Sequence, residues 1–311
     1  NDEIPVSGRE YLRWLDDLFV MHGVAMYEGN PQWRWDEKKK QFISDQVSDE
    51  MKNAVAFIRS LYAKGYMDKT MPILKGADWL AKIEKNTVGH YFHTTSGMER
   101  RVTALRSAVS GATPLAPDAE FVYMPNVQVG NLPHQKNYAG GLTPDIAITV
   151  KAKDPAKILQ WYDWIWSQEG TIYKFFGIEG LNYKREGSKI VVDKTVTSLS
   201  NKFPFVMRSG NRTAEMYSWM PAGDQMAAVY KASINDAQFV QNTFMPVKVY
   251  DGFEDYIPSK APLYQERVAK IIIGELPMEA WDAYVKEWND KGGKVVTERA
   301  TQWYKDVHGI K

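Results

Sequence analysis

The clearest pattern in the chain is an amphipathic helix that begins after Ser48. Ser48 is a favoured N-cap residue, two acidic residues follow it in the first turn, and Gly65 is typical of a helix end. Apolar side chains recur between them at helical spacing, at Met51, Val55, Ile58, Leu61 and Tyr62. The pattern therefore predicts a helix over residues 49–64.

Similar apolar stripes predict helices along the rest of the chain. One should follow the turn at residues 7–8, because Leu12, Leu15 and Leu18 fit the helical period. Another should begin at Pro155, a favoured first helical residue, with Asp154 as its N-cap. Helices are expected at 77–85, 97–110, 155–170, 262–273, 278–290 and 296–307.

Short apolar runs between these helices are typical of buried strands. The first begins at Ile4 and leads into a turn at residues 7–8, and others are expected at 88–93, 121–125 and 146–150. Residues 181–184 and 188–192 predict a hairpin around 185–187, and 29–42 is predicted to be a loop. Short strands alternating with helices indicate an α/β architecture.

Composition narrows the functional classes. The 311 residues suffice for two ordinary domains or one large one, and 44% hydrophobic with 25% charged residues is typical of globular proteins. Thirty-nine basic against 38 acidic residues gives a net charge of +1, without the basic excess of a nucleic-acid binder. The sequence contains no apolar run long enough to predict a membrane span.

Cysteine is absent, which excludes disulfides, thiol nucleophiles and zinc–thiolate sites. This fits an exported bacterial protein, although many cytosolic proteins also lack cysteine. The chain opens at Asn1 without a methionine, so we expect a processed or trimmed product.

Motifs of common enzyme classes are missing from the sequence. It contains no glycine-rich phosphate loop and no Gly-x-Ser-x-Gly nucleophile elbow. The five histidines do not fall at metal-ligand spacing on any predicted helix. A pair of glycosidase carboxylates remains open, because 38 acidic residues make chance pairs certain.

Aromatic residues are the compositional outlier, with 11 Trp, 17 Tyr and 12 Phe. An aromatic ring offers a flat face on which the C–H face of a sugar can lie. Trp33 and Trp35 are two residues apart in the predicted loop, where an extended backbone would place both rings on one side. Tyr217 and Trp219 repeat that spacing. These pairs are candidate sugar platforms, and core packing is the alternative for each.

Four segments in one order match a known family. They are residues 1–8 (Asn-Asp-Glu-Ile-Pro-Val-Ser-Gly), 64–68 (Lys-Gly-Tyr-Met-Asp), 154–183 and 279–293. Together they resemble the extracellular solute-binding proteins (family 1) of bacterial ABC importers. Within that family they are similar to the lipoprotein-type group that serves sugar and oligosaccharide uptake.

The resemblance implies an α/β, two-lobed type II periplasmic-binding-protein-like fold with ligand held between the lobes. It also implies that the N-terminal portion is missing from this chain. Residues 1–139 would form the first part of lobe 2, and 140–200 would cross into lobe 1. Residues 201–311 would return mainly to lobe 2 and be helical.

The resemblance also implies where ligand would bind. The turns after the first two strands should face the cleft, and the crossing between the lobes and the pair Tyr217 and Trp219 are further candidates. Trp33 and Trp35 are candidates from their spacing. The candidate ligand-binding residues are Ser7, Tyr11, Trp33, Trp35, His93, Thr94, Ser96, Tyr138, Tyr217 and Trp219.

A metal site is implied at the N-terminus. In many family members a calcium loop precedes the Ile-Pro strand, and Asp2 and Glu3 match its last two acids. Calcium takes six to eight oxygen ligands, so these two carboxylates alone would not hold it. The full-length protein would then bind Ca²⁺, and two acids at a flexible terminus is the alternative.

The expected function is therefore extracytoplasmic binding of an oligosaccharide and its delivery to ABC permease subunits. This role needs no enzyme activity and no cofactor, and the membrane would be reached only through a lipid anchor on the missing N-terminus. Two alternatives remain. One is a secreted glycoside hydrolase or lectin-like carbohydrate-binding protein, and the other is an importer subunit for a non-sugar solute.

Overall fold

The computed structural model describes residues 3–93, 118, 120, 122–125, 127, 129–130, 148–192, 215, 218–219, 223–236 and 245–310. The chain divides into two compact units. Unit 1 comprises residues 1–93, 125–143 and 236–311, and unit 2 comprises 94–124 and 144–235. The lobe boundaries implied by the family resemblance stay a prediction.

A pair of parallel strands organises unit 1. β1 (Ile4–Val6) lies beside β6 (Val88–His90), with Ile4 opposite Val88 and Val6 opposite His90. Both strands were expected from the sequence, although β6 ends before residue 93. Parallel strands need a long crossover. Here it contains α2 (Asp49–Ala63), a 3-10 turn (Met71–Ile73) and α3 (Gly76–Glu84), which lies near the predicted 77–85.

The helix predicted after Ser48 is confirmed as α2. The Ser48 hydroxyl accepts a hydrogen bond from the Met51 backbone N–H at 3.1 Å, and Gly65 has a left-handed φ of 79°. Met51, Val55 and Ile58 are fully buried. Local sequence and tertiary packing agree along this helix.

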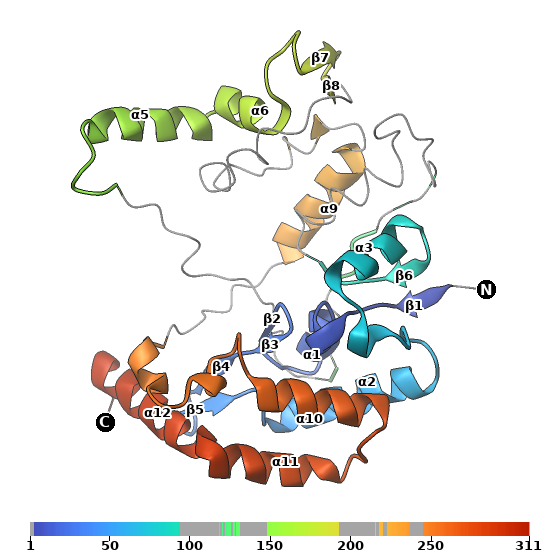
Figure 1. The fold of residues 1–311 in the computed structure, drawn as a ribbon, viewed down its shortest axis with the longest axis vertical. Coiled ribbons are helices and arrows are strands. Elements are labelled where there is room, and N and C mark those ends of the chain that lie inside the picture. The colour runs from blue at the N-terminus through green and yellow to red at the C-terminus, as the bar shows by residue number, and fades with distance from the viewer. Residues whose placement is uncertain are drawn as a thin grey trace. The chain divides into compact units, whose positions relative to one another are not determined.

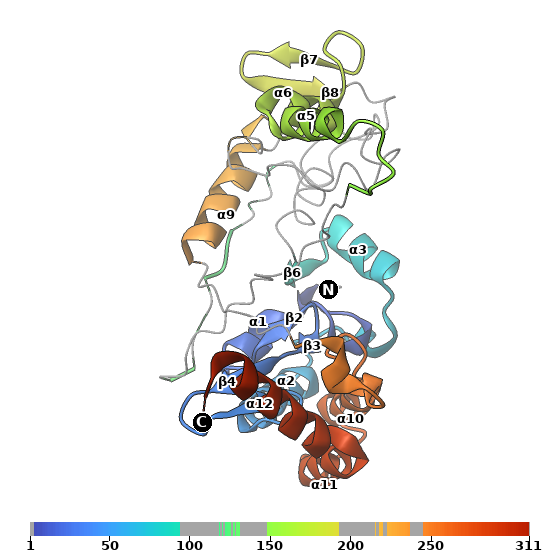
Figure 2. The same cartoon turned by 90° about the vertical axis from the view of Figure 1, so that its left-hand side faces the viewer.

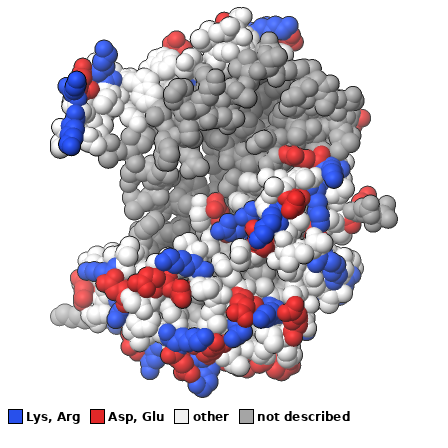
Figure 3. All heavy atoms as spheres, in the orientation of Figure 1, with Lys and Arg blue, Asp and Glu red and all other residues white. Residues whose placement is uncertain are grey.

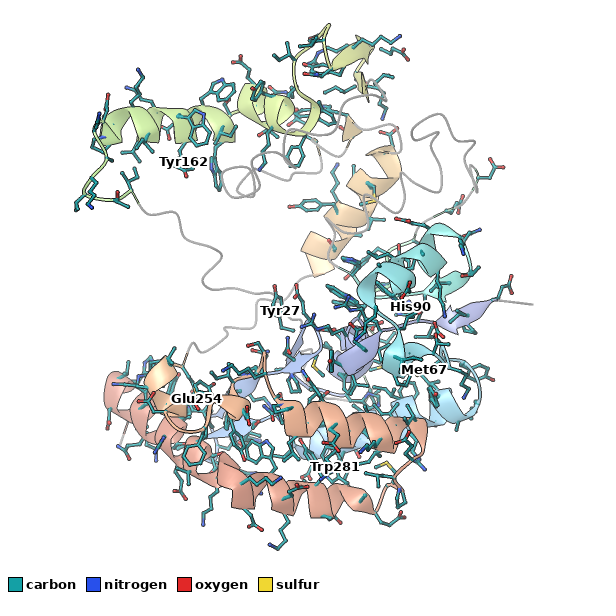
Figure 4. All side chains as sticks on the ribbon, viewed as in Figure 1. Tyr27, Met67, His90, Tyr162, Glu254 and Trp281 are labelled. Atoms are coloured by element: carbon teal, nitrogen blue, oxygen red, sulfur yellow. The ribbon has the colours of Figure 1, made fainter. Side chains whose placement is uncertain are left out.

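The core of unit 1 forms where α2 meets the C-terminal helices. α10 (Pro262–Ile273) packs on α2, and α11 (Ala280–Trp288) packs on α10, as Figure 1 shows. Trp281, labelled in Figure 4, is 2% exposed in this layer, and Tyr264 is fully buried. The predicted helix at 262–273 is confirmed.

Ion pairs join the same helices on the outside. Arg267 on α10 pairs with Glu287 on α11 at 3.1 Å, and Lys52 on α2 pairs with Asp282 at 2.8 Å. Figure 3 shows acidic and basic side chains interspersed over the visible face of these helices. Exposed pairs contribute at most about 1 kcal/mol each, so burial of the apolar stripes stabilises this layer.

The predicted loop at residues 29–42 is wrong. The chain forms two antiparallel hairpins there, β2 (Met26–Tyr27) with β3 (Asn30–Pro31) and β4 (Trp33–Asp36) with β5 (Gln41–Ser44). Trp33 and Phe42 are buried, and Trp35 lies opposite Phe42 in the ladder. The two-residue spacing of the tryptophans is therefore the period of a half-buried strand.

The C-terminal helix covers this second hairpin. α12 (Lys294–His308) packs on β5, and Figure 2 shows it beside β4 of the same hairpin. The Phe42 N–H donates to the Thr301 hydroxyl at 3.0 Å. The Tyr304 ring lies 4.4 Å from the Trp35 ring, centroid to centroid. Trp33 packs instead against Trp288 at 6.0 Å. Both tryptophans thus contribute to the hydrophobic core of unit 1.

The helix expected after residue 8 is largely replaced by irregular backbone. A 3-10 turn (Glu10–Leu12) precedes a short α1 (Asp16–Val20). Leu12, Leu15 and Leu18 are buried as the stripe predicted. They reach the core through a backbone in which Tyr11, Leu12 and Trp14 have positive φ.

The predicted break at residues 291–293 is a π-helical turn. It spans Asn289–Gly293 and joins α11 directly to α12. Gly292 has a φ of 134°, a conformation that favours glycine. Two further 3-10 turns, Val247–Tyr250 and Glu254–Tyr256, lie before α10.

Unit 2 contains two consecutive helices where one was expected. α5 (Pro155–Trp166) is capped by Asp154, whose carboxylate accepts from the Lys157 N–H at 2.9 Å. Ser167 then caps a second helix, α6 (Gln168–Phe176), through the Gly170 N–H. Ser167 is thus an N-cap in the same way as Ser48, and it divides the predicted helix into two.

A hairpin and one more helix complete the described part of unit 2. β7 (Tyr183–Glu186) pairs with β8 (Lys189–Val192), so the predicted hairpin is confirmed, but its turn is at residues 187–188 instead of 185–187. α9 spans Gly223–Asp236. Their small core contains Ile172, Phe176, Ile190 and Met226.

Two predicted strands are not borne out where the structure describes them. Residues 122–125 and 148–150 contain no strand. Val150 is wholly exposed, and the Thr149 carbonyl accepts from the Ala152 N–H in a turn. β-Branched residues favour a strand only where a neighbouring strand pairs with them. The helix predicted at 97–110 lies outside the described residues.

Replacing Gly292 by alanine should destabilise unit 1. An added Cβ would lie 2.2 Å from the Phe253 ring, and the left-handed φ would be strained. Overpacking and strain together should lower the free energy of unfolding by about 2–5 kcal/mol. Urea unfolding followed by tryptophan fluorescence measures the change.

Gly309→Ala is the matched control for that substitution. Gly309 has a φ of 63° but nothing within 4 Å of an added Cβ, so its replacement should cost only about 1 kcal/mol. Equal losses from the two variants would contradict the packing argument.

Candidate functional site

The carboxyl ends of β1 and β6 form the candidate site. In open α/β folds, ligands bind beyond the carboxyl ends of the parallel strands. Ser7 lies there directly after β1, fully buried, and its backbone N–H donates to the His90 carbonyl at 3.0 Å. Its hydroxyl oxygen has no hydrogen-bond partner among the described residues.

The turn that follows Ser7 is strained. Tyr11, Leu12 and Trp14 have φ values of 63°, 59° and 63°, and none of them is a glycine. Each such residue costs roughly 1–3 kcal/mol and persists only where its surroundings hold it. Leu12 is buried as a result, while the Tyr11 side chain remains 51% exposed.

Backbone hydrogen bonds hold this turn closed. The Arg9 N–H donates to the Arg13 carbonyl at 3.0 Å in an antiparallel bridge, and the Glu10 N–H donates to the Leu74 carbonyl at 3.1 Å. Residues 9–13 therefore form a small loop that is fixed to the segment before α3. Tyr11 lies at the exposed part of that loop.

Basic groups predominate at the turn. Arg9 and Arg13 oppose each other across the bridge, an arrangement that is unfavourable for like charges. The Lys75 ammonium lies 6.0 Å from the centre of the Tyr11 ring. One acidic group, Glu10, lies 3.9 Å from the Arg9 guanidinium. The turn is therefore suited to ligands with acceptor oxygens.

An aromatic cluster packs against Trp14, the last residue of the strained turn. Trp14 stacks on His93 at 4.4 Å and on Trp79 of α3 at 5.9 Å. Trp79 is buried and meets Tyr91 edge-on at 6.0 Å. His93, a predicted ligand residue, thus lies in the stack that supports Trp14.

An ion pair ties β6 to α1. The His90 ring nitrogen and the Asp17 carboxylate are 2.5 Å apart, and Figure 4 labels His90 on this strand. The hydrogen bond with Asp17 raises the pKa of His90 above its usual 6.5 and outweighs burial, which lowers it. The charged form of His90 is therefore favoured in the folded chain.

Asp16, the neighbouring residue, is buried at the β2–β3 turn. Both of its carboxylate oxygens accept from the Gly29 N–H at 3.1 Å. Burial raises the pKa of Asp16 to about 7, although that hydrogen bond opposes the shift. Gly29 has a φ of 77°, and a Cβ there would meet Arg13 at 2.9 Å. Tyr27, labelled in Figure 4, is 36% exposed beside this turn.

The structure brings some of the predicted ligand residues together and separates others. Ser7, Tyr11 and His93 lie around the ends of β1 and β6. Trp33 and Trp35 belong to the β4–β5 hairpin, and the burial of Trp33 weighs against a binding role. Trp219 lies in unit 2, where it packs against the core and its carbonyl accepts from the Ile190 N–H. Thr94, Ser96, Tyr138 and Tyr217 lie outside the described residues.

Sequence reasoning missed the basic and aromatic groups of the turn. Arg9, Arg13 and Lys75 carry no distinctive spacing, and Trp14 fell within a predicted helix. The left-handed residues had no signal either, because glycine usually marks such positions.

The described residues offer no complete metal site. Among them, no group of three or more His, Cys, Asp or Glu side chains could hold a metal ion. Glu3 is exposed, and Asp2 lies outside the described part of the chain. One described carboxylate falls far short of the six to eight oxygens that calcium takes.

His90 should titrate above pH 6.5 in the wild-type chain. Because its folded-state pKa is raised, the ion pair stabilises the fold fully below pH 6.5 and is lost as pH rises through the folded pKa. NMR titration of the ring should show the midpoint falling in Asp17→Asn. A wild-type midpoint at or below 6.5 would contradict the pairing.

Asp16 should make unit 1 less stable as pH rises. Its pKa is about 7 in the fold against 3.8 as the ordinary value, so stability should fall between about pH 4 and 7. The slope from this one group can reach about 1.4 kcal/mol per pH unit. Asp16→Asn keeps an acceptor for Gly29 and should flatten the dependence in urea unfolding. An unchanged slope would show that Asp16 is ionised throughout.

Comparisons with known proteins identify similar chains. No protein-family model matches the sequence. Over 91% of its length the chain is 19% identical to the polygalacturonan/rhamnogalacturonan-binding protein YtcQ of Bacillus subtilis (strain 168). It covers 56% of YtcQ, so the chain spans little more than half of that relative.

Two solved structures share the fold. The alginate-binding protein AlgQ2, solved without calcium ion, superposes with a TM-score of 0.57 at 16% identity, over 98% of this chain and 64% of AlgQ2. FusA, an ABC-transporter substrate binding protein of S. pneumoniae solved with kestose, gives 0.56 at 16% identity, over 100% of this chain and 64% of FusA. An EF-hand mutant of FusA gives 0.57.

Among the described residues, no helix combines the length and apolarity that a membrane span requires. The resemblance predicted from the sequence is confirmed, because the similarity extends over nearly the whole chain. The chain is similar to the two-lobed solute-binding proteins of ABC importers and shares their α/β fold over the 64% of AlgQ2 and FusA that it covers.

Proposed function

We propose that this chain is part of an extracytoplasmic protein that binds an oligosaccharide and delivers it to an ABC permease. The strained turn after β1 is the observation that carries the proposal. It holds Tyr11 half exposed in the turn that follows a parallel strand, with the Lys75 ammonium 6.0 Å from the centre of its ring. An aromatic face beside hydrogen-bonding groups is what a sugar ring requires.

The similar proteins support a carbohydrate ligand. YtcQ is named for binding polygalacturonan and rhamnogalacturonan, AlgQ2 for binding alginate, and FusA was solved with kestose. The polymers named for YtcQ and AlgQ2 are acidic polysaccharides, whereas kestose is a neutral oligosaccharide. The basic Arg9 and Arg13 would suit an acidic oligosaccharide, so binding should be tested with both acidic and neutral oligosaccharides.

We infer that the protein binds without catalysis. Binding proteins need a cleft and polar partners but no acid–base pair, and the similar proteins are named for binding. A secreted hydrolase would differ in one respect, since it would release product on prolonged incubation. Sustained product release from any bound oligosaccharide would exclude the transport role.

The proposed location of the protein and the proposed calcium site rest on the same resemblance. The protein would lie outside the cytoplasm, either in the periplasm or at the cell surface through a lipid anchor. Asp2 and Glu3 would end a calcium loop that begins before this chain. The names of two similar structures, which mention calcium and an EF-hand, support the metal.

Tyr11→Ala should weaken oligosaccharide binding. Removing a stacking ring costs roughly 1–3 kcal/mol, by analogy with base stacking, which corresponds to about 5- to 150-fold in Kd. Isothermal titration calorimetry with oligogalacturonate, oligoalginate and kestose measures the affinity. Circular dichroism checks that the variant folds.

Tyr66→Ala is the matched control for that measurement. Tyr66 is 50% exposed in unit 1, as Tyr11 is, but lies after α2 and outside the strained turn. It should leave the affinity unchanged. Equal losses from the two variants, or none from Tyr11→Ala, would remove Tyr11 from the binding site.

A further inference from the structure

Unit 2 contains a pocket of its own. Its volume is about 510 Å³, within the range of about 300–1,000 Å³ typical of small-molecule sites. The end of α5, the first turns of α6, the loop at 177–179 and the start of β7 line it. Figure 1 shows these elements following one another, with the β7–β8 hairpin beyond α6. All of them belong to unit 2, whereas the strained turn belongs to unit 1.

The loop wall of this pocket is rigid. The Ile178 N–H donates to the Asn182 side-chain oxygen at 2.8 Å, and the Asn182 N–H returns a bond to the Ile178 carbonyl at 2.8 Å. Gly177 has a φ of 90°, and a Cβ there would lie 2.3 Å from that same oxygen. Little ordering entropy would therefore be lost when a ligand binds against this wall.

Aromatic and apolar groups form part of the pocket lining. The Trp164 and Tyr173 rings lie 5.3 Å apart, tilted by 55°. Both residues are half-buried, so part of each ring reaches solvent. The buried residues Ile172 and Tyr183 also line the pocket. Such a surface suits the C–H face of a ring-shaped ligand.

Hydrogen-bonding groups also line the pocket. The Arg185 Nε lies 3.2 Å from a Glu179 carboxylate oxygen, which fixes both groups at the rim. Gln168 and Glu169 add further donors and acceptors. Two carboxylates and one guanidinium give the lining a charge of −1 (1 − 2), which disfavours an anionic ligand. Alternating donors and acceptors match the hydroxyl groups of a neutral sugar.

We propose that this pocket binds a single neutral sugar residue. The ring would stack on Trp164 and Tyr173, and its hydroxyls would bond to Arg185, Glu179 and Gln168. The site is independent of the strained turn, since no residue is shared. The inference therefore stands whether or not the turn in unit 1 binds an oligosaccharide.

Titration with methyl glycosides of glucose, galactose and mannose tests the proposal. Tryptophan indole NMR signals of the whole chain report the binding. We expect at least one glycoside to shift the Trp164 signal in a saturable manner. Trp164→Ala should weaken this binding about 5- to 150-fold, the range expected for a stacking ring.

Trp161→Ala is the matched control on the same helix. Trp161 is 38% exposed on α5, and its ring contacts Tyr162, but it does not line the pocket. It should leave glycoside binding intact. In Tyr11→Ala the saturable shift of the Trp164 signal should persist, whatever that variant does to binding in unit 1, which separates the two sites.

A second variant keeps the test decisive if Trp164→Ala fails to fold. Glu179 is exposed, and Glu179→Gln frees Arg185 from its partner without changing the size of the side chain. It should weaken glycoside binding by at least several-fold. The proposal is overturned if no glycoside shifts Trp164, if Trp161→Ala loses binding equally, or if only uronates or peptides bind there.

Discussion

The pairing of β1 with β6 is the contact on which the candidate site of this chain depends. Among the residues that the structure describes, two strands take part, and more than 80 residues of crossover separate them. The pairing brings Ser7 beside His90, so the turn after β1 and the segment after β6 meet at one edge. In the crossover, α2 buries its apolar stripe against α10, and α3 buries Trp79 and Ile83 in a cluster that includes Val88 of β6. This packing on both sides holds the two short strands in register.

The turn after β1 shows how that scaffold tolerates local strain. Three left-handed residues other than glycine persist because Leu12 is buried and two backbone hydrogen bonds close the loop. The stacking of Trp14 on His93 and Trp79 also holds this turn in place. A binding residue held in this way loses little entropy when it contacts a ligand, which links the strained backbone to the proposed function.

Tryptophan residues have different roles in the cores and in the pocket of this chain. In unit 1, Trp33, Trp281 and Trp288 are buried and provide core volume. In unit 2, Trp164 and Tyr173 remain partly exposed around a pocket with a rigid wall. The high aromatic content therefore has two origins, and composition alone could not separate them, since the same rings serve packing and ligand stacking.

The sequence by itself determined the elements whose signals are local. Ser48, the stripe from Met51 to Ile58 and Gly65 specify α2, because capping and periodicity act within a few residues. The place of Ser7 at the end of a strand followed from the same reasoning together with the family resemblance. Tertiary structure decided the rest. Trp33 and Trp35 became strand residues because Trp288 of α11 packs on the first and Tyr304 of α12 on the second. Arg9 came to face Arg13 because buried leucines force the intervening backbone out of a helix. Neither outcome has a local signal, since each depends on contacts between segments far apart in the chain.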